Sequence, residues 1–232
     1  MAAVEDKREL NAEQIKKSVA DISQGINNLS GTFSPYTIFS DWVKMYALSI
    51  CNMLEPMKGA LWEVREKAYM ATASKYTSEQ LKSFAELSGR LVELYDIAGP
   101  YDALGEIYMF SGCGNKGTGQ FFTPFHLSKL VADVALKNIK NGEKIRINEP
   151  SCGGGGMILA AARLINESGG DARMQMDIVA QDLDWNSIYM TYIQLSLNGL
   201  NAVCIQGDSL MVCSSVPREC VLETPRKRGV LL

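Results

Sequence analysis

The sequence lacks the residue patterns that are typical of metal sites, secretion signals and membrane spans. Its six cysteines form no Cys-x-x-Cys pair, and His126 is its single histidine, so a zinc site is not expected. No basic segment followed by an apolar stretch opens the chain, and no apolar run approaches ~18 residues. These absences predict a cytoplasmic protein with no metal and no membrane contact, in which the cysteines are reduced and buried as small hydrophobic residues.

Basic residues are also scarcer than in most protein chains that bind nucleic acid. The sequence has 23 Lys and Arg against 26 Asp and Glu, a net charge of −3. DNA-binding domains usually carry a basic field that releases counterions from phosphate, so contact with DNA is expected only through a local patch or a partner. One short basic run, Arg226-Lys227-Arg228, has two interpretations: a cluster that contacts phosphate, or a solvated tail.

The first half of the chain is expected to be helical. Its 232 residues are enough for one substantial domain and a helical extension. Apolar residues recur at helical spacing from about residue 13 to residue 112, as in Ile15, Val19, Ile22 and Ile26. The segment 77–80, Thr-Ser-Glu-Gln, supplies cap residues for one of these helices. We therefore predict a helical N-terminal region over residues 1–112.

Residues 113–232 are expected to alternate between strands and helices. The pattern predicts strands at 144–148, 177–181 and 202–206, with helices at 124–140, 157–165 and about 185–198. Strands that alternate with helices in this way are typical of an α/β fold with an open parallel sheet. The tail after these elements is polar and basic, and we predict that it is irregular.

The most informative local pattern is a glycine-rich turn, Glu149-Pro-Ser-Cys-Gly-Gly-Gly-Gly156, between a predicted strand and a predicted helix. Glycine lets a ligand approach the main chain closely. A P-loop would need Lys and Ser or Thr after the glycines, and the dinucleotide spacing GxGxxG fails in both registers, at Ile158 and Leu159. An acidic residue before the glycines instead suits a ligand with an ammonium group. A tight turn without a ligand is the alternative.

Acidic residues also follow the next two predicted strands. Asp182 lies 33 residues after Glu149, which in a βαβ unit places both carboxylates at the carboxyl edge of the sheet, where such folds bind ligands. Asp182 would accept hydrogen bonds from ribose hydroxyls, and Asp208 from an adenine amino group. The alternatives are a solvated residue or helix cap at Asp182, although Asp184 suits the cap equally well, and an ordinary turn residue at Asp208.

Four motifs occur together along the chain: Gly119-Gln-Phe-Phe-Thr-Pro124, the Glu149–Gly156 turn, Gln181-Asp182 and Gly207-Asp-Ser-Leu210. In order and approximate spacing they resemble N6-adenine DNA methylases, above all the modification subunits of type I restriction–modification systems. The resemblance covers roughly residues 91–210. It implies the Rossmann-like fold of S-adenosylmethionine-dependent methyltransferases, here with a partial sheet, behind the all-helical N-terminal region.

The resemblance also implies the cofactor, the partners and the site residues. The cofactor would be S-adenosylmethionine, and the partners would be DNA with a specificity subunit or a second copy of the chain. The methionine end of the cofactor would lie against residues 122–124, and its amino-acid group would lie in the turn at 149–155. The ribose of the cofactor would lie at Asp182 and its adenine at Asp208. The residues that this resemblance assigns to cofactor binding are Phe122, Thr123, Pro124, Glu149, Ser151, Gly153, Gly155, Asp182, Leu183 and Asp208.

The catalytic loop of that family is not found in this sequence. The family places Asn, Asp or Ser before Pro-Pro-Tyr or Pro-Pro-Phe to hold the flipped adenine, and none of the seven prolines here adjoins another. Catalytic residues are therefore unassigned, and we expect little methyl transfer from this chain alone. It is either part of a longer protein or a complete short relative. The alternative function is a non-catalytic module that binds DNA or a partner and has a vestigial cofactor pocket.

Overall fold

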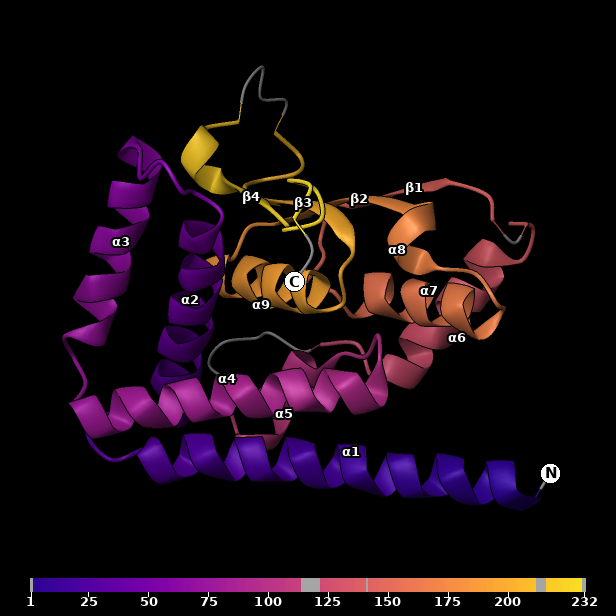
Figure 1. Ribbon diagram of the computed structural model, residues 1–232, viewed down its shortest axis with the longest axis horizontal. Helices are drawn as coiled ribbons and strands as arrows, with labels where there is room; N and C mark the ends of the chain where they lie inside the picture. The colour runs from indigo at the N-terminus through magenta and orange to yellow at the C-terminus, as the bar shows by residue number, and fades with distance from the viewer. Residues whose placement is uncertain (1, 114–121, 141, 212–215, 231–232) are drawn as a thin grey trace.

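The computed structural model describes residues 2–113, 122–140, 142–211 and 216–230 of the chain. Its N-terminal region is helical, as the apolar spacing predicts, and α1 runs along the side of the molecule opposite the sheet (Figure 1). The helices of this region are α1 (Ala2–Leu29), α2 (Pro35–Met53), α3 (Ala60–Ala73), α4 (Ser78–Ala98) and α5 (Ala103–Phe110).

Local capping explains where two of these helices begin. The Thr77 hydroxyl accepts a hydrogen bond from the Gln80 amide at 3.3 Å, and the Gln80 side chain accepts one from the Thr77 amide at 2.9 Å, which together form a capping box at α4. Helix α2 begins at Pro35 behind Ser34, whose hydroxyl accepts from the Thr37 amide. The cap predicted at residues 77–80 is therefore confirmed.

The second half contains the predicted parallel sheet. Strands β1 (Ile145–Glu149), β2 (Met176–Asp182) and β3 (Asn201–Gln206) lie side by side in chain order. Helix α6 (Phe125–Leu136) precedes β1, and helices α7 (Gly156–Glu167) and α9 (Trp185–Leu197) connect the strands; the short α8 (Ala172–Gln175) leads into β2. The predicted α/β order is confirmed.

The tail differs from its predicted irregular form. A 3-10 turn, η1 (Arg218–Cys220), leads into β4 (Val221–Glu223), which pairs antiparallel with β3. Leu222 is buried, and the Thr224 hydroxyl donates to the Leu200 carbonyl at 2.8 Å and accepts from the Ala202 amide at 3.0 Å. The expectation was wrong here because a strand of this length is too short to show a period, and its pairing partner lies some twenty residues earlier in the chain.

One hydrophobic core joins both halves of the chain. It includes Ile22 and Trp42 from the N-terminal helices, and Ile158, Tyr192 and Cys204 from the sheet half. Helix α2 packs against α9 across the boundary predicted at residues 112 and 113, and that boundary stays a prediction. The free thiols of Cys51, Cys113, Cys152 and Cys204 are buried as predicted and that of Cys220 is half-buried, whereas Cys213 lies outside the described residues.

The two faces of the sheet differ in their cover. Helices α7 and α9 lie against one face (Figure 1). On the other face Arg146, Asn148, Asp177 and Val179 are exposed, while the residues between them are buried or half-buried. Parallel sheets are usually covered on both faces, so the described part of this chain leaves one face open. Within the same residues, β1 has a neighbouring strand only on its β2 side.

Candidate cofactor site

The turn between β1 and α7, residues 150–155, is shaped by two glycines with left-handed backbones. The φ angle is 52° at Gly153 and 89° at Gly155. A Cβ atom at Gly153 would lie 3.2 Å from the ring of Phe122, and one at Gly155 would lie 3.1 Å from Thr191 Oγ1. Both positions therefore favour glycine for its conformation and for the space it leaves.

This glycine turn is bonded to the end of β2. The Gly153 amide donates to Asp182 Oδ2 at 2.9 Å, and the Cys152 amide donates to the Gln181 carbonyl at 2.9 Å. The cap of α9 is Asp184, whose carboxylate accepts from the Ser187 amide at 2.9 Å. Asp182 is thus not the helix cap, and its carboxylate instead fixes the glycine turn against the second strand.

The end of β3 lies at the same carboxyl edge. The Gly207 amide donates to the Asp182 carbonyl at 2.9 Å, which ties the turn after β3 to the end of β2. Asp208, in that turn, is exposed and accepts from the Leu210 amide at 2.9 Å, as an ordinary turn residue also does. Leu183 follows Asp182 and is 68% exposed, an apolar side chain left in solvent at this edge.

Glu149 ends β1 at the same edge. It lies level with Ala180 of β2, two residues before Asp182. Its side chain is half-buried, and burial raises the pKa of its carboxyl, while a hydrogen bond from the Ser151 backbone lowers it. Ser151 is exposed. The structure therefore brings the predicted turn residues and all three predicted acids to one edge of the sheet.

The three residues predicted from the Phe-Phe-Thr-Pro motif lie beside the turn. Phe122 packs over Gly153 and edge-to-face against Tyr108, with ring centroids 5.1 Å apart. Thr123 and Pro124 are exposed, and all three line a cavity of about 520 Å³ that Glu149, Asp182 and Asp208 do not line. Phe122 is thus the link between that cavity and the glycine turn. The preceding Gly119 to Phe121 lie outside the described residues.

A buried polar network behind the glycine turn was not anticipated from the sequence. The Asp102 carboxylate is buried, caps α5 by accepting from the Gly105 amide at 3.0 Å, and accepts from Gln194 Nε2 at 2.9 Å. Gln194 Nε2 also donates to the Gly154 carbonyl at 2.5 Å. Burial raises the pKa of the Asp102 carboxyl, and the bonds from Gln194 and Gly105 lower it.

The other side of Gln194 completes this network. Its Oε1 accepts from the Leu104 amide at 3.0 Å and from the Tyr95 hydroxyl. Thr191, one turn earlier on α9, donates to the Gly153 carbonyl at 2.8 Å. Two carbonyls of the glycine turn are therefore held from behind by one helix. The sequence signal is the pair of polar residues, three apart, in an otherwise apolar stretch of α9.

The edge offers hydrogen-bond acceptors and donors together. Glu149, Asp182 and Asp208 provide carboxylates, and no side chain caps α7, which begins at Gly156. The free amides of a helix N-terminus and its dipole favour an anionic group. This combination is complementary to a ligand that carries an ammonium group, a carboxylate and sugar hydroxyls.

Sequence comparison gives the family. The family model of N-6 DNA Methylase matches residues 100–214. Residues 100–214 of this chain belong to the N-6 DNA methylase family. The matched methylase region extends from just before Asp102 to beyond Asp208, so it contains the buried network around Asp102 and Gln194 and all the residues predicted for the cofactor.

Two solved structures are similar in fold to this methylase chain. One is a putative class I S-adenosylmethionine-dependent methyltransferase from Listeria monocytogenes, 13% identical over 87% of this chain and 56% of that one, with a TM-score of 0.48. The other is a type I restriction-modification system methyltransferase subunit from Streptococcus thermophilus, 18% identical over 83% and 43%, with a TM-score of 0.46. The chain spans about half the length of either structure. No curated protein matches it.

The described residues of the methylase chain lack two kinds of feature. None of their helices is both long and apolar enough to cross a membrane. These residues also contain no group of three or more His, Cys, Asp or Glu side chains placed to hold a metal ion. The groups that the candidate site offers to a ligand are its carboxylates, its backbone amides and the ring of Phe122.

Proposed function

We propose that this chain is the S-adenosylmethionine-binding domain of a DNA adenine N6-methyltransferase similar to the modification subunits of type I systems. The observation that carries the proposal is the 2.9 Å bond from the Gly153 amide to the Asp182 carboxylate. It joins the glycine turn to the acid of the second strand at the carboxyl edge, where open α/β sheets bind ligands. The family match over residues 100–214 supports the same assignment.

The chemistry of the residues fits this cofactor group by group. Glu149, at the end of β1, would accept from the ammonium group, and the first turn of α7, which no side chain caps, would donate to the carboxylate. Asp182 Oδ2 accepts from the Gly153 amide and Oδ1 from the Asp184 amide, so the ribose hydroxyls would use the remaining lone pairs of this carboxylate. The exposed Leu183 offers apolar cover. Asp208 would accept from the adenine amino group.

S-adenosylmethionine supplies, when bound, an electrophilic methyl group on a sulfonium. The residues of this chain would bind the cofactor and orient its methyl group. The Glu149 carboxyl has a raised pKa in the free protein, and an ammonium group beside it would lower that pKa and favour the ionised form. Phe122 packs over Gly153 and limits access of water to the turn from that side. The network of Asp102, Gln194 and Thr191 keeps the turn in position before the ligand arrives.

The remaining parts of the proposal concern activity and partners. The residues that would hold a target adenine are unassigned, so little methyl transfer is expected from the chain alone. DNA would be the substrate, reached with a specificity subunit or a second copy of the chain, in the cytoplasm. A tritiated-methyl assay on adenine-containing DNA tests this, and strong incorporation would contradict the expected weak activity.

Calorimetric titration with S-adenosylmethionine tests the site itself. Asp182→Asn removes the charge that holds the Gly153 amide, and hydrogen bonds to charged groups contribute about 1.5–3 kcal/mol, so we expect affinity to fall at least about tenfold. Asp177→Asn is the matched control, since it removes the same charge from the opposite end of β2 and should leave the affinity unchanged. A folded protein that gives no heat and no thermal shift at millimolar cofactor would instead favour the non-catalytic interaction module.

A further inference from the structure

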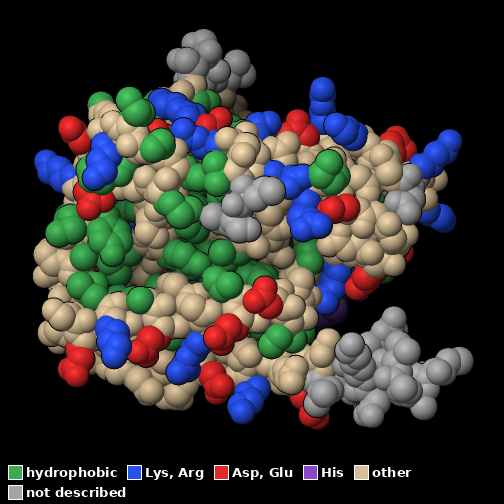
Figure 2. All heavy atoms as spheres, in the orientation of Figure 1, with side chains coloured by type: hydrophobic (Ala, Val, Ile, Leu, Met, Phe, Trp, Pro, Cys, Tyr) green, Lys and Arg blue, Asp and Glu red, His purple; other side chains and the backbone are tan. Residues whose placement is uncertain are grey.

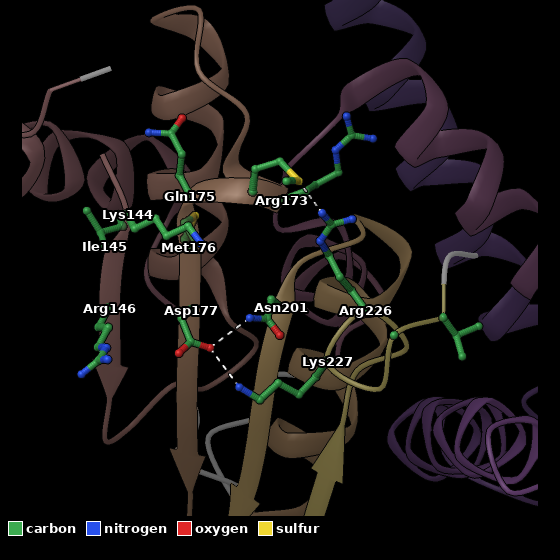
Figure 3. Close-up of a pocket in the computed structure, with 13 residues that line it drawn as sticks. Lys144, Ile145, Arg146, Arg173, Gln175, Met176, Asp177, Asn201, Arg226 and Lys227 are labelled. Carbon is green, nitrogen blue, oxygen red and sulfur yellow. Dashed lines mark hydrogen bonds and ion pairs between the residues drawn. The ribbon is translucent and has the colours of Figure 1, made fainter. Parts of the chain in front are cut away.

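A second cavity lies at the other end of the sheet, where the parallel strands begin (Figure 3). Its volume is about 870 Å³. It is lined by the start of β1 and β2, by the first residue of β3, by α8 and by the C-terminal turn at residues 226–230. It faces away from Glu149 and Asp182, which end the same strands. We call it the basic pocket.

Positive charge is concentrated in the basic pocket. Its lining includes five cationic side chains from three separate segments and a single acidic one, Asp177. In a chain with a net charge of −3 this is a local reversal of sign. Figure 2 shows Lys and Arg side chains gathered beside the C-terminal residues, over the region of α8. The cations that line the pocket are Lys144, Arg146, Arg173, Arg226 and Lys227.

The basic run at residues 226–228 is held by contacts and is not a solvated tail. Lys227 Nζ reaches Asp177 Oδ1 at 3.0 Å, and the same oxygen accepts from Asn201 Nδ2 at 3.0 Å (Figure 3). Arg228 pairs with Glu55 at 2.7 Å, which anchors the run to the loop after α2. These contacts place Arg226 and Lys227 beside the N-terminal ends of β2 and β3.

Three of the five cations are not neutralised by an acid. Among the ion pairs of the described residues, none involves Lys144, Arg146 or Arg226, whereas Arg173 pairs with Asp171 and Lys227 with Asp177. Arg226 donates to the sulfur of Met174, an uncharged and weak acceptor. Lys144 and Arg146 are exposed and two residues apart in extended chain, so they lie on the same face. The pocket therefore presents uncompensated charge to solvent.

The chemistry of the lining selects one class of ligand. Arg and Lys side chains in a cluster bind phosphate oxygens by charge-assisted hydrogen bonds. Among the described residues that line the basic pocket none is aromatic, so they offer no surface on which a base would stack. Spread over three segments, the cations exceed the needs of one phosphate group. We propose that the basic pocket binds successive phosphates of a nucleic-acid backbone, independently of base sequence and apart from the cofactor edge.

Fluorescence anisotropy of a short labelled DNA duplex, titrated with the full chain between about 50 and 200 mM salt, tests the proposal. Lys144→Gln/Arg146→Gln removes two uncompensated cations from the pocket. Each phosphate contact contributes about one unit to the slope of log affinity against log salt, so we expect the slope to fall by about two and affinity to fall about tenfold. Duplexes with and without adenine should behave alike.

Lys82→Gln/Arg90→Gln is the matched control. It removes one Lys and one Arg that are exposed on α4 and lie outside the basic pocket, and both slope and affinity should stay as in the unchanged chain. Arg226→Gln is a second pocket variant and should lower the slope by about one. Circular dichroism verifies that each variant is folded.

The proposal is overturned if the pocket and control variants weaken duplex binding equally, or if the unchanged chain does not bind the duplex. It is also overturned if poly-glutamate displaces the duplex at equal charge concentration, because the pocket would then select an acidic polypeptide. Titration with S-adenosylmethionine separates this result from the proposed function. The Lys144→Gln/Arg146→Gln variant should keep the cofactor affinity of the unchanged chain, whichever way the duplex experiment falls.

Discussion

At the carboxyl ends of β1, β2 and β3 the chain places acids and glycine, and at their amino ends it places lysine and arginine. The negative and the positive side chains therefore lie at opposite ends of the same three strands, one strand length apart. A net charge of −3 conceals this, because it averages over both ends. The overall charge of a domain is therefore a poor guide to what either end of its sheet binds.

The two edges also differ in how their side chains are held. At the carboxyl edge the glycine turn is supported by two buried side chains: Gln194 donates both to the Asp102 carboxylate and to the Gly154 carbonyl. At the amino edge Lys227 and Arg173 are held by partly exposed ion pairs, which typically contribute ~0–1 kcal/mol. A rigid edge suits a small ligand of fixed shape, and an adaptable edge suits a polyanion with no fixed sequence.

The largest expected effect comes from removing the buried support of the carboxyl edge. Gln194→Ala removes the side-chain donor of the Asp102 carboxylate and the acceptor of the Tyr95 hydroxyl. It also removes the bonds that Gln194 makes to the Gly154 carbonyl and the Leu104 amide. Leaving one buried polar group without its hydrogen-bond partner costs about 1–3 kcal/mol. Because several groups lose a partner at once, we expect the free energy of unfolding, measured in urea, to fall by at least about 3 kcal/mol.

Gln24→Ala is the control for this prediction. Gln24 is exposed on α1 and bonds only to Asn28 among the described contacts, so its loss should change stability by no more than about 0.5 kcal/mol. If Gln194→Ala unfolds like Gln24→Ala, the carboxyl edge is not built more rigidly than the amino edge, and the comparison fails.

A smaller effect is expected from filling the space beside Asp102. A Cβ atom at Gly156 would lie 2.8 Å from Asp102 Oδ2, whereas one at Gly89 in α4 meets no heavy atom within 4 Å. Gly156→Ala should therefore destabilise the fold by about 1–3 kcal/mol. Gly89→Ala should stabilise it by about 0.5–1 kcal/mol, because alanine is the better helix former. Thermal unfolding of both variants measures the opposite signs, and equal signs would contradict the packing described for the glycine turn.

The smallest effect is a pH dependence at the same edge. Burial raises the pKa of the Asp102 carboxyl in the folded chain above the ordinary value of 3.8. Between pH 3.8 and this raised pKa, the folded chain therefore binds more protons at Asp102 than the unfolded chain does. The free energy of unfolding should then fall as pH rises through that window. Asp102→Asn lacks this contribution, and the difference in urea midpoint, unchanged chain minus variant, should decrease with rising pH. An increase would mean that Asp102 is stabilised in its charged form.

The order of elements could be predicted from sequence because its causes are local. The spacing of apolar and turn residues determines the α/β alternation. The caps at Thr77 and Asp184 can be recognised from the sequence because each cap residue bonds to an amide only three residues later. Glu149, Asp182 and Asp208 fell at one edge because parallel strands align their ends. The assignment of these residues to the cofactor stays a prediction.

What could not be predicted depends on contacts between distant parts of the chain. Gln194 meets Asp102 across 92 residues and Arg228 meets Glu55 across 173. The polar residues of α9 mark Gln194 in the sequence but do not identify Asp102 as its partner. In the same way, no local pattern identifies Glu55 as the partner of Arg228, so the sequence left two interpretations of residues 226–228 open. Its position is given only by the ion pairs of Lys227 with Asp177 and of Arg228 with Glu55.

The outer edge of β1 has one more consequence. A strand with a free side presents backbone N–H and C=O groups on which a strand of another molecule can extend the sheet. Lys144 and Arg146 stand at that side and are exposed. Two identical edges that approach each other bring like charges together, so these cations oppose fibre-like growth of the sheet. Among the described residues, the free edge of the sheet therefore carries a charge that disfavours its pairing with a second copy of itself.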